Sequence, residues 1–170
     1  MVKHKVVRIT AILLIIVVSI TEYAFGQEHE ISKLKFSFEH ALRIPDHYVT
    51  VVFLNAHDSV RVYVTSNPAT KVSKKWDKTK RNYSFNISKE EFNKIVTSIT
   101  QINCSDVLAA LTYRGNDGTS CEIELSNYSN AIKYRVWSPN YNTEKRNLHS
   151  FLNACKLILL TARLNPDEIF

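Results

Sequence analysis

The sequence predicts an α+β domain, in which an antiparallel sheet of about five or six strands carries two helices packed on one face, preceded by a signal peptide. Three observations support this fold class. Short segments with alternating apolar and polar residues occur in pairs, as in β-hairpins. Two longer segments have apolar residues at helical spacing. A hydrophobic run near the N-terminus follows neither pattern.

The N-terminus has the three-part organisation of a secretory signal peptide. The first eight residues include three basic and no acidic side chains, and the next twelve are mainly apolar. A small-x-small motif then ends at Gly26, so cleavage is expected between Gly26 and Gln27. The alternative is an uncleaved membrane anchor, but a spanning helix needs about 20 apolar residues. We therefore expect residues 1–26 to be removed and residues 27–170 to be secreted or periplasmic, as one domain without a membrane span.

Composition and charge place this domain among ordinary globular proteins. Its 144 residues suffice to bury a core without metal ions or a dense disulfide framework. It has 19 basic and 15 acidic side chains, a balance too mild to indicate nucleic acid as a partner. No cofactor motif is present, so no cofactor is expected.

The first half of the domain predicts four strands. Alternation predicts a strand over residues 34–38 and another over 83–87. Between them, the β-branched runs 49–54 and 60–65 flank a polar turn and predict a hairpin. Its expected register pairs Val51 with Val64, Phe53 with Val62, and Val52 with Tyr63.

A helix is expected directly after the fourth strand. Ser88 as the N-cap and Glu91 three residues later form a capping box. Apolar residues follow at helical spacing, namely Phe92, Ile95, Val96, Ile99 and Ile102. Residues 103–111 have no clear pattern.

Residues 121–125 and 132–136 predict a second hairpin. One register places Leu125 opposite Ile132, Ile123 opposite Tyr134, and Cys121 opposite Val136. The same register pairs Glu124 with Lys133 and Glu122 with Arg135. A slip by one residue would disrupt both the apolar face and the charge pairs, so the register is well specified.

The C-terminal part predicts a long final helix. Thr143 serves as its N-cap, and the helix extends from Glu144 to about Leu164 before Pro166 stops it. Its apolar stripe consists of Leu148, Phe151, Leu152, Cys155, Leu159 and Ala162, widened by Leu157, Ile158 and Leu160.

The three cysteines, Cys104, Cys121 and Cys155, all lie after the predicted cleavage site. In an oxidising compartment one pair can form a disulfide and the third stays free or pairs between molecules. Cys121 and Cys155 fall on apolar faces, so two buried thiols are the alternative. The spacing does not select a pair.

Two surfaces are candidates for binding. Residues 71–81 contain six basic residues and an aromatic one, which suits an anionic partner; a solvated loop is the alternative. The residues of interest there are Lys74, Lys75, Trp76 and Lys78. In the second hairpin, Trp137 shares a face with Lys133 and Arg135, and Tyr141 follows closely. Trp137 is then either an interface anchor or a cover for the open face, stacked on Arg135. Arg114 belongs to a polar loop expected near the same end.

Catalytic signals are weak in this sequence. No histidine has zinc-ligand spacing, and there is no nucleophile elbow or glycine-rich loop. We therefore expect an exported, non-enzymatic protein that binds a macromolecule, either a protein or an anionic surface, as inhibitors, immunity-type proteins and accessory proteins do. A small secreted hydrolase with a dispersed site is the alternative, and a structural envelope component is a third possibility.

Overall fold

The structure is a computed structural model that describes residues 31–40, 48–67, 70–72, 75–77, 80–110, 112, 115 and 118–170. The predicted signal peptide and its cleavage site between Gly26 and Gln27 lie outside these residues. So do Lys74, Lys78 and Arg114, while only the backbone of Lys75 and Trp76 is described.

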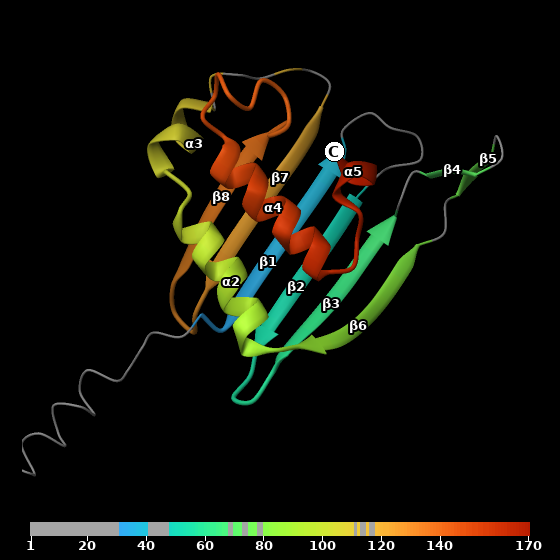
Figure 1. Cartoon of the computed structure of the whole chain (residues 1–170), viewed down its shortest axis with the longest axis vertical. Coiled ribbons are helices and arrows are strands. Elements are labelled where there is room, and N and C mark those ends of the chain that lie inside the picture. The colour runs from blue at the N-terminus through green and yellow to red at the C-terminus, as the bar shows by residue number, and fades with distance from the viewer. Residues whose placement is uncertain are drawn as a thin grey trace, which may run out of the picture. The chain divides into compact units, whose positions relative to one another are not determined.

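A six-stranded antiparallel sheet forms the centre of the described chain, so the α+β class predicted from the sequence is confirmed (Figure 1). The strand order across the sheet is β6-β3-β2-β1-β7-β8. The strands are β1 (Lys33–His40), β2 (Tyr48–Asn55), β3 (Val60–Asn67), β6 (Arg81–Ile87), β7 (Thr119–Ser126) and β8 (Ala131–Trp137). The first described strand is therefore central and pairs with both β2 and β7.

Both predicted hairpin registers are confirmed. In β2 and β3, Val51 lies opposite Val64 and Phe53 opposite Val62, with a tight turn between the strands. In β7 and β8, the pairs are Leu125 with Ile132, Ile123 with Tyr134, Cys121 with Val136, Glu124 with Lys133, and Glu122 with Arg135.

The capping box at Ser88 is also confirmed. The Glu91 backbone N–H donates to Ser88 Oγ at 3.1 Å, and the Ser88 N–H donates to Glu91 Oε2 at 2.9 Å. Helix α2 (Lys89–Thr100) follows and buries Phe92, Ile95 and Ile99. A short helix, α3 (Cys104–Ala110), occupies the segment that had no clear sequence pattern.

The predicted start of the final helix is wrong. Helix α4 spans His149–Thr161, because Asn147 has a left-handed backbone (φ 51°) that a helix interior does not allow. Thr143 lies in the preceding turn, where its hydroxyl donates to the Pro139 carbonyl rather than capping a helix. Leu160 is 60% exposed and does not widen the buried stripe. Helix α4 ends before Pro166, as expected, and a short helix, α5 (Pro166–Ile169), begins at that proline.

One core lies between the sheet and the helices. Phe53 of β2 contacts Phe92 of α2 at a ring-centroid distance of 6.1 Å. Tyr83 of β6 donates its hydroxyl to the Ala162 carbonyl, just beyond α4, at 2.6 Å. Figure 1 shows α2 and α4 crossing the same face of the sheet. We call the opposite face, whose side chains are half-buried or exposed, the outer face.

The polar segment after β3 contains two short strands where the sequence predicts a loop. Strand β4 (Thr70–Val72) pairs with β5 (Lys75–Asp77) in a separate two-stranded sheet. None of the helices in the described ranges combines the length and hydrophobicity needed to span a membrane.

Candidate functional site

Trp137 lies on the outer face but is packed against its neighbours. Its ring meets that of Tyr141 edge-on, with centroids 6.0 Å apart, and the Arg146 guanidinium carbon lies 5.9 Å from the Trp137 centroid. Gly118 lies beneath it, because a Cβ at that position would approach Trp137 Nε1 to 2.6 Å. The cation beside Trp137 is therefore Arg146, whereas the sequence suggested Arg135.

Arg146 organises this corner and was not singled out from the sequence. It is only 4% exposed and donates three hydrogen bonds to backbone carbonyls, those of Ser138 (2.7 Å), Trp137 (2.8 Å) and Tyr141 (3.0 Å). A buried cation that binds several carbonyls of one loop holds that loop in shape. The sequence did not indicate this role for Arg146. Residue 146 was expected in the first turn of the final helix, where its side chain would not reach these carbonyls.

The predicted cations of β8 are engaged within the outer face. Lys133 bridges Glu122 at 3.1 Å and Glu124 at 3.2 Å, and its hydrogen bonds to these carboxylates raise the pKa of its ammonium group. Arg135 donates from Nε to Ser120 Oγ at 3.2 Å, although its cross-strand partner is Glu122. On the β7–β8 part of the outer face, the two acidic and the two basic side chains therefore balance one another in charge.

The part of the outer face over β1, β2 and β3 is different. Two neighbouring rows cross these strands, Lys35–Val52–Tyr63 and Lys33–Leu54–Arg61. We call these six residues the outer patch. Leu54 is 40% exposed and Tyr63 is 46% exposed, so the patch presents apolar surface as well as three cations.

The cations of the outer patch form no ion pair in the described part of the chain, although Lys35 lies opposite Glu124 of β7 in the register. None of Lys33, Lys35 and Arg61 forms an ion pair there. Arg61 is held flat on the sheet, since it donates to Ser84 Oγ at 2.7 Å and to Asn86 Oδ1 at 3.3 Å and lies 5.9 Å from the Tyr63 ring centroid. The sequence already placed Val52 and Tyr63 on this face, but the neighbouring β1 cations follow only from the strand order.

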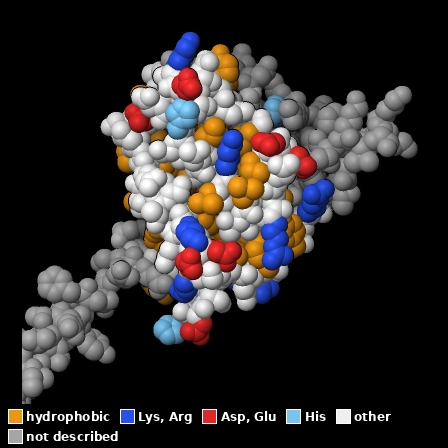
Figure 2. Space-filling model, viewed as in Figure 1, with side chains coloured by type: hydrophobic (Ala, Val, Ile, Leu, Met, Phe, Trp, Pro, Cys, Tyr) orange, Lys and Arg blue, Asp and Glu red, His pale blue; other side chains and the backbone are white. Residues whose placement is uncertain are grey.

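The helix side of the molecule has a more mixed surface. Figure 2 shows basic, acidic and apolar side chains interspersed on it, without one large patch of a single kind. The segment containing Lys74, Lys75, Trp76 and Lys78 has no described side chain, so these predicted binding residues remain predictions, as does Arg114.

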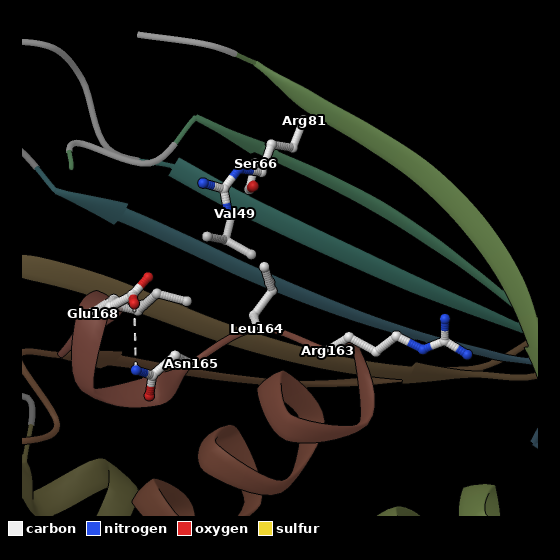
Figure 3. A pocket seen from close by; sticks show the side chains of 8 residues that line it. Val49, Ser66, Arg81, Arg163, Leu164, Asn165 and Glu168 are labelled. Atoms are coloured by element: carbon white, nitrogen blue, oxygen red, sulfur yellow. Dashed lines mark hydrogen bonds between the residues drawn. The ribbon is translucent and has the colours of Figure 1, made fainter. Parts of the chain in front are cut away.

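A pocket of about 220 Å³ lies on the helix side, between the ends of β2, β3 and β6 and the chain after α4 (Figure 3). Ser66 is buried at its wall, and its hydroxyl has no hydrogen-bond partner among the described residues. Arg163 points away from Ser66 and stacks on Phe85, with 4.1 Å from the guanidinium carbon to the ring centroid. Asn165 Nδ2 donates to Glu168 Oε1 at 3.4 Å.

The groups around this pocket do not form a nucleophile–base pair. Its lining is Val49, Ser66, Arg81, Arg163, Leu164, Asn165, Glu168 and Ile169, which includes no histidine to activate the Ser66 hydroxyl. Within the described ranges, no cluster of three His, Cys, Asp or Glu side chains is suited to a metal ion.

Comparison with known proteins adds no assignment. No protein-family model matches the chain, and no curated protein matches its sequence.

Proposed function

We propose that this chain is an exported, non-enzymatic binding protein whose outer patch docks on an acidic protein surface. The observation that carries the proposal is the set of three cations, Lys33, Lys35 and Arg61, none of which forms an ion pair with another described residue, around exposed apolar side chains. Such a surface complements carboxylates that surround an apolar centre.

The physical support comes from the rigidity of the patch. Its residues stand on three adjacent strands of the main sheet, and Arg61 is fixed by two side-chain hydrogen bonds. Less side-chain and backbone freedom is therefore lost on binding than for a patch on a loop. Tyr63 supplies the amphipathic aromatic surface that interfaces favour near their centre.

Export belongs to the same proposal and rests on the sequence of residues 1–26, with its basic start, apolar run and small-x-small end. It restricts the partner to a protein of the cell envelope or the medium.

A hydrolase is the less favoured alternative. The pocket in Figure 3 places Ser66 near Arg81, and its lining contains no general base of the histidine type. An esterase or protease reaction at Ser66 would need such a base.

The test is a binding comparison between charge-reversed proteins. The triple variant Lys33→Glu/Lys35→Glu/Arg61→Glu and the wild type are immobilised and exposed to envelope extracts, and a captured protein is then purified and titrated. We expect the reversal to weaken binding about tenfold or more, and binding to the wild type to weaken with added salt.

The matched control is Lys145→Glu/Lys156→Glu, which reverses charges outside the outer face and is expected to bind like the wild type. Equal affinity of the patch variant and the wild type for the purified partner would exclude the outer patch. Circular dichroism melting of all three proteins separates a binding defect from misfolding.

The two surfaces predicted from the sequence remain secondary proposals. Trp137→Ala removes the aromatic corner, and Lys74→Ala/Lys75→Ala/Trp76→Ala removes the basic segment with its tryptophan. If either variant alone loses the partner while the outer-patch reversal keeps it, the interface lies there instead.

A further inference from the structure

The pocket in Figure 3 is built on one row of side chains that crosses three strands. Val49 of β2 lies opposite Ser66 of β3, and Ser66 lies opposite Arg81 of β6. Side chains directly opposite each other on one face of a sheet are close neighbours, with Cβ atoms about 5 Å apart. Within a short distance the row therefore changes from a buried apolar residue, through a buried hydroxyl, to an exposed cation on the edge strand.

The other wall of the pocket is the chain that follows α4. Leu164 and Ile169 supply its apolar part, and Figure 3 shows Leu164 pointing toward Val49. The turn is closed by the Leu164 N–H, which donates to the Leu159 carbonyl at 2.9 Å, and Asn165 caps α5 directly after it. Both walls are thus hydrogen-bonded structure, as in ligand sites that are formed before the ligand binds.

Ser66 is the unusual member of the row. It is only 1% exposed, and its hydroxyl has no hydrogen-bond partner within the part of the chain that the structure describes. A buried hydroxyl without a partner costs free energy, so native proteins keep few of them. The other inward positions of β3 are occupied by Val60, Val62 and Val64, which carry no such cost. A ligand that hydrogen-bonds to the hydroxyl accounts for a serine at this position.

Arg81 supplies positive charge beside Ser66. Figure 3 shows its guanidinium near Ser66, whereas Arg163 is directed away. Arg81 forms no ion pair in the described ranges. Burial raises the pKa of the Tyr83 hydroxyl, and the charges of Arg81 and Arg163 oppose that rise, so both cations act on this end of β6. The lining also includes one carboxylate, that of Glu168, which disfavours a ligand with several negative charges.

The pocket lining contains no cysteine. Cys121 and Cys155 are fully buried in the core as free thiols. Cys104 is an exposed free thiol on α3, and its sulfur lies 3.7 Å from the Tyr134 hydroxyl oxygen. The polar chemistry beside the buried floor of the pocket is therefore that of Ser66 and Arg81.

We propose that this pocket binds a small monocarboxylate. The Ser66 hydroxyl and the Arg81 guanidinium donate hydrogen bonds to its two carboxylate oxygens. Its apolar body contacts Val49, Leu164 and Ile169. A guanidinium is well suited to this contact, because its planar N–H groups match the geometry of a carboxylate.

The size of the pocket limits the ligand. A cavity of about 150 Å³ holds benzene. The present volume of about 220 Å³ accommodates a ring or a short branched chain with one carboxylate. Inorganic phosphate fits less well, because it has no apolar part to cover Val49 and Leu164. The site goes beyond the docking function proposed above and does not depend on it, since the outer patch lies on the opposite face of the sheet.

The experiment titrates the ¹⁵N-labelled protein with benzoate and with isovalerate, and follows its amide resonances by NMR. Benzamide and isovaleramide are the neutral counterparts of the same size. We expect at least one acid to shift the amides of Ser66 and Leu164 saturably, with a dissociation constant of about 1 mM or lower. Its amide should bind about tenfold more weakly or worse. No saturable shift with either acid up to about 20 mM, or equal binding of acid and amide, would overturn the proposal.

Two further comparisons test the contacts and the ligand class. Arg81→Gln should weaken binding of the acid about tenfold or more. Lys145→Gln removes a cation outside the lining and should bind like the wild type. Equal losses in the two variants would show an effect of net charge and overturn the contact with Arg81. Inorganic phosphate that competes as strongly as the acid itself would contradict the preference for a carboxylate.

Ser66→Ala separates a ligand contact from a role in folding. Since the Ser66 hydroxyl has no partner within the described fold, its removal should leave the melting temperature within about 3 °C of the wild type or raise it. Affinity for the acid should nevertheless fall about threefold or more. Unchanged affinity, or a melting temperature lowered by much more than this, would assign the hydroxyl to the fold and count against the site.

Discussion

Several residues of the loop between Trp137 and α4 have backbone conformations that residues other than glycine usually avoid. Ser138, Asn142 and Asn147 all have positive φ angles, between 39° and 51°. Such residues cost free energy and persist only where surrounding contacts fix them. Arg146 supplies these contacts, since its guanidinium binds the carbonyls of Trp137, Ser138 and Tyr141.

Gly118→Ala tests how tightly this corner is packed. Gly118 has a φ of 149°, and an added Cβ would approach Ser138 Oγ to 2.5 Å and Trp137 Nε1 to 2.6 Å. We expect Gly118→Ala to lower the free energy of unfolding by about 2 kcal/mol or more, because both the backbone and the ring must shift. Urea denaturation measures this loss.

The matched control is the same substitution in a Trp137→Ala background, where part of the clash is absent. The loss should be smaller there, as a double-mutant cycle would show. Equal losses in the two backgrounds would mean that Trp137 does not cause the effect.

Arg163 gives a second prediction at this scale. It has a φ of 61° and follows α4 in a Schellman motif, with Leu164 N–H donating to the Leu159 carbonyl at 2.9 Å. Both Arg163→Gly and Arg163→Ala remove the contact with Phe85, but only glycine relieves the left-handed strain. We expect the glycine variant to be more stable than the alanine variant by about 1 kcal/mol in urea denaturation. Equal stabilities would contradict the motif.

At the scale of elements, the capping box of α2 makes folding sensitive to acid. Hydrogen bonds from the Ser88 backbone and side chain lower the pKa of Glu91 below its ordinary value of 4.5. A carboxylate with a lowered pKa in the folded state stabilises the fold above the ordinary value. That contribution is lost as the pH falls through the lowered pKa.

Melting temperatures recorded between about pH 6 and pH 2 test this expectation. Near neutral pH the wild type should melt at a higher temperature than Glu91→Gln, and the difference should shrink in acid. Ser88→Ala removes one of the two hydrogen bonds to Glu91 and should show a weaker pH dependence than the wild type. A constant difference between wild type and Glu91→Gln would exclude the ionised cap as its cause.

The strands and the first helix were predictable because each depends on neighbouring residues. Alternation in β7 and β8, together with the charge pairs, specified one register, and Ser88 with Glu91 specified a helix start. The start of α4 was not predictable in this way. The residues before it have helical spacing, but Arg146 binds carbonyls of the preceding loop and Asn147 is left-handed. Both features depend on tertiary contacts.

On the scale of the whole molecule, the outer patch was the part that the sequence predicted least. The hairpin pattern places Val52 and Tyr63 on one face, but it does not place Lys35 beside them. The position of Lys35 beside these residues arises because β1 lies between β2 and β7. Local sequence patterns do not specify such a non-consecutive strand order. The sequence instead drew attention to Lys133 and Arg135, which the structure shows engaged with Glu122, Glu124 and Ser120.

The proposed export predicts a defined mature chain. Expressed from its full coding sequence in a bacterial host, the protein should be recovered from the periplasm or medium with Gln27 as its first residue. N-terminal sequencing and intact mass measure this. Replacement of two leucines in the apolar run, Leu13→Arg/Leu14→Arg, should block processing and leave the full chain in the cell. An intact Met1 on wild-type protein in the cytosol would contradict the proposal.

The central position of β1 has a consequence for the order of assembly when a chain emerges N-terminus first. Strands β2 and β3 follow closely and can join β1 as soon as they appear, but Phe36 of β1 pairs with Ile123 of β7, more than eighty residues later. Contacts between such distant segments form slowly. Until β7 arrives, one edge of the nascent sheet lacks its neighbour, so the core between the sheet and the helices closes only after most of the chain has emerged.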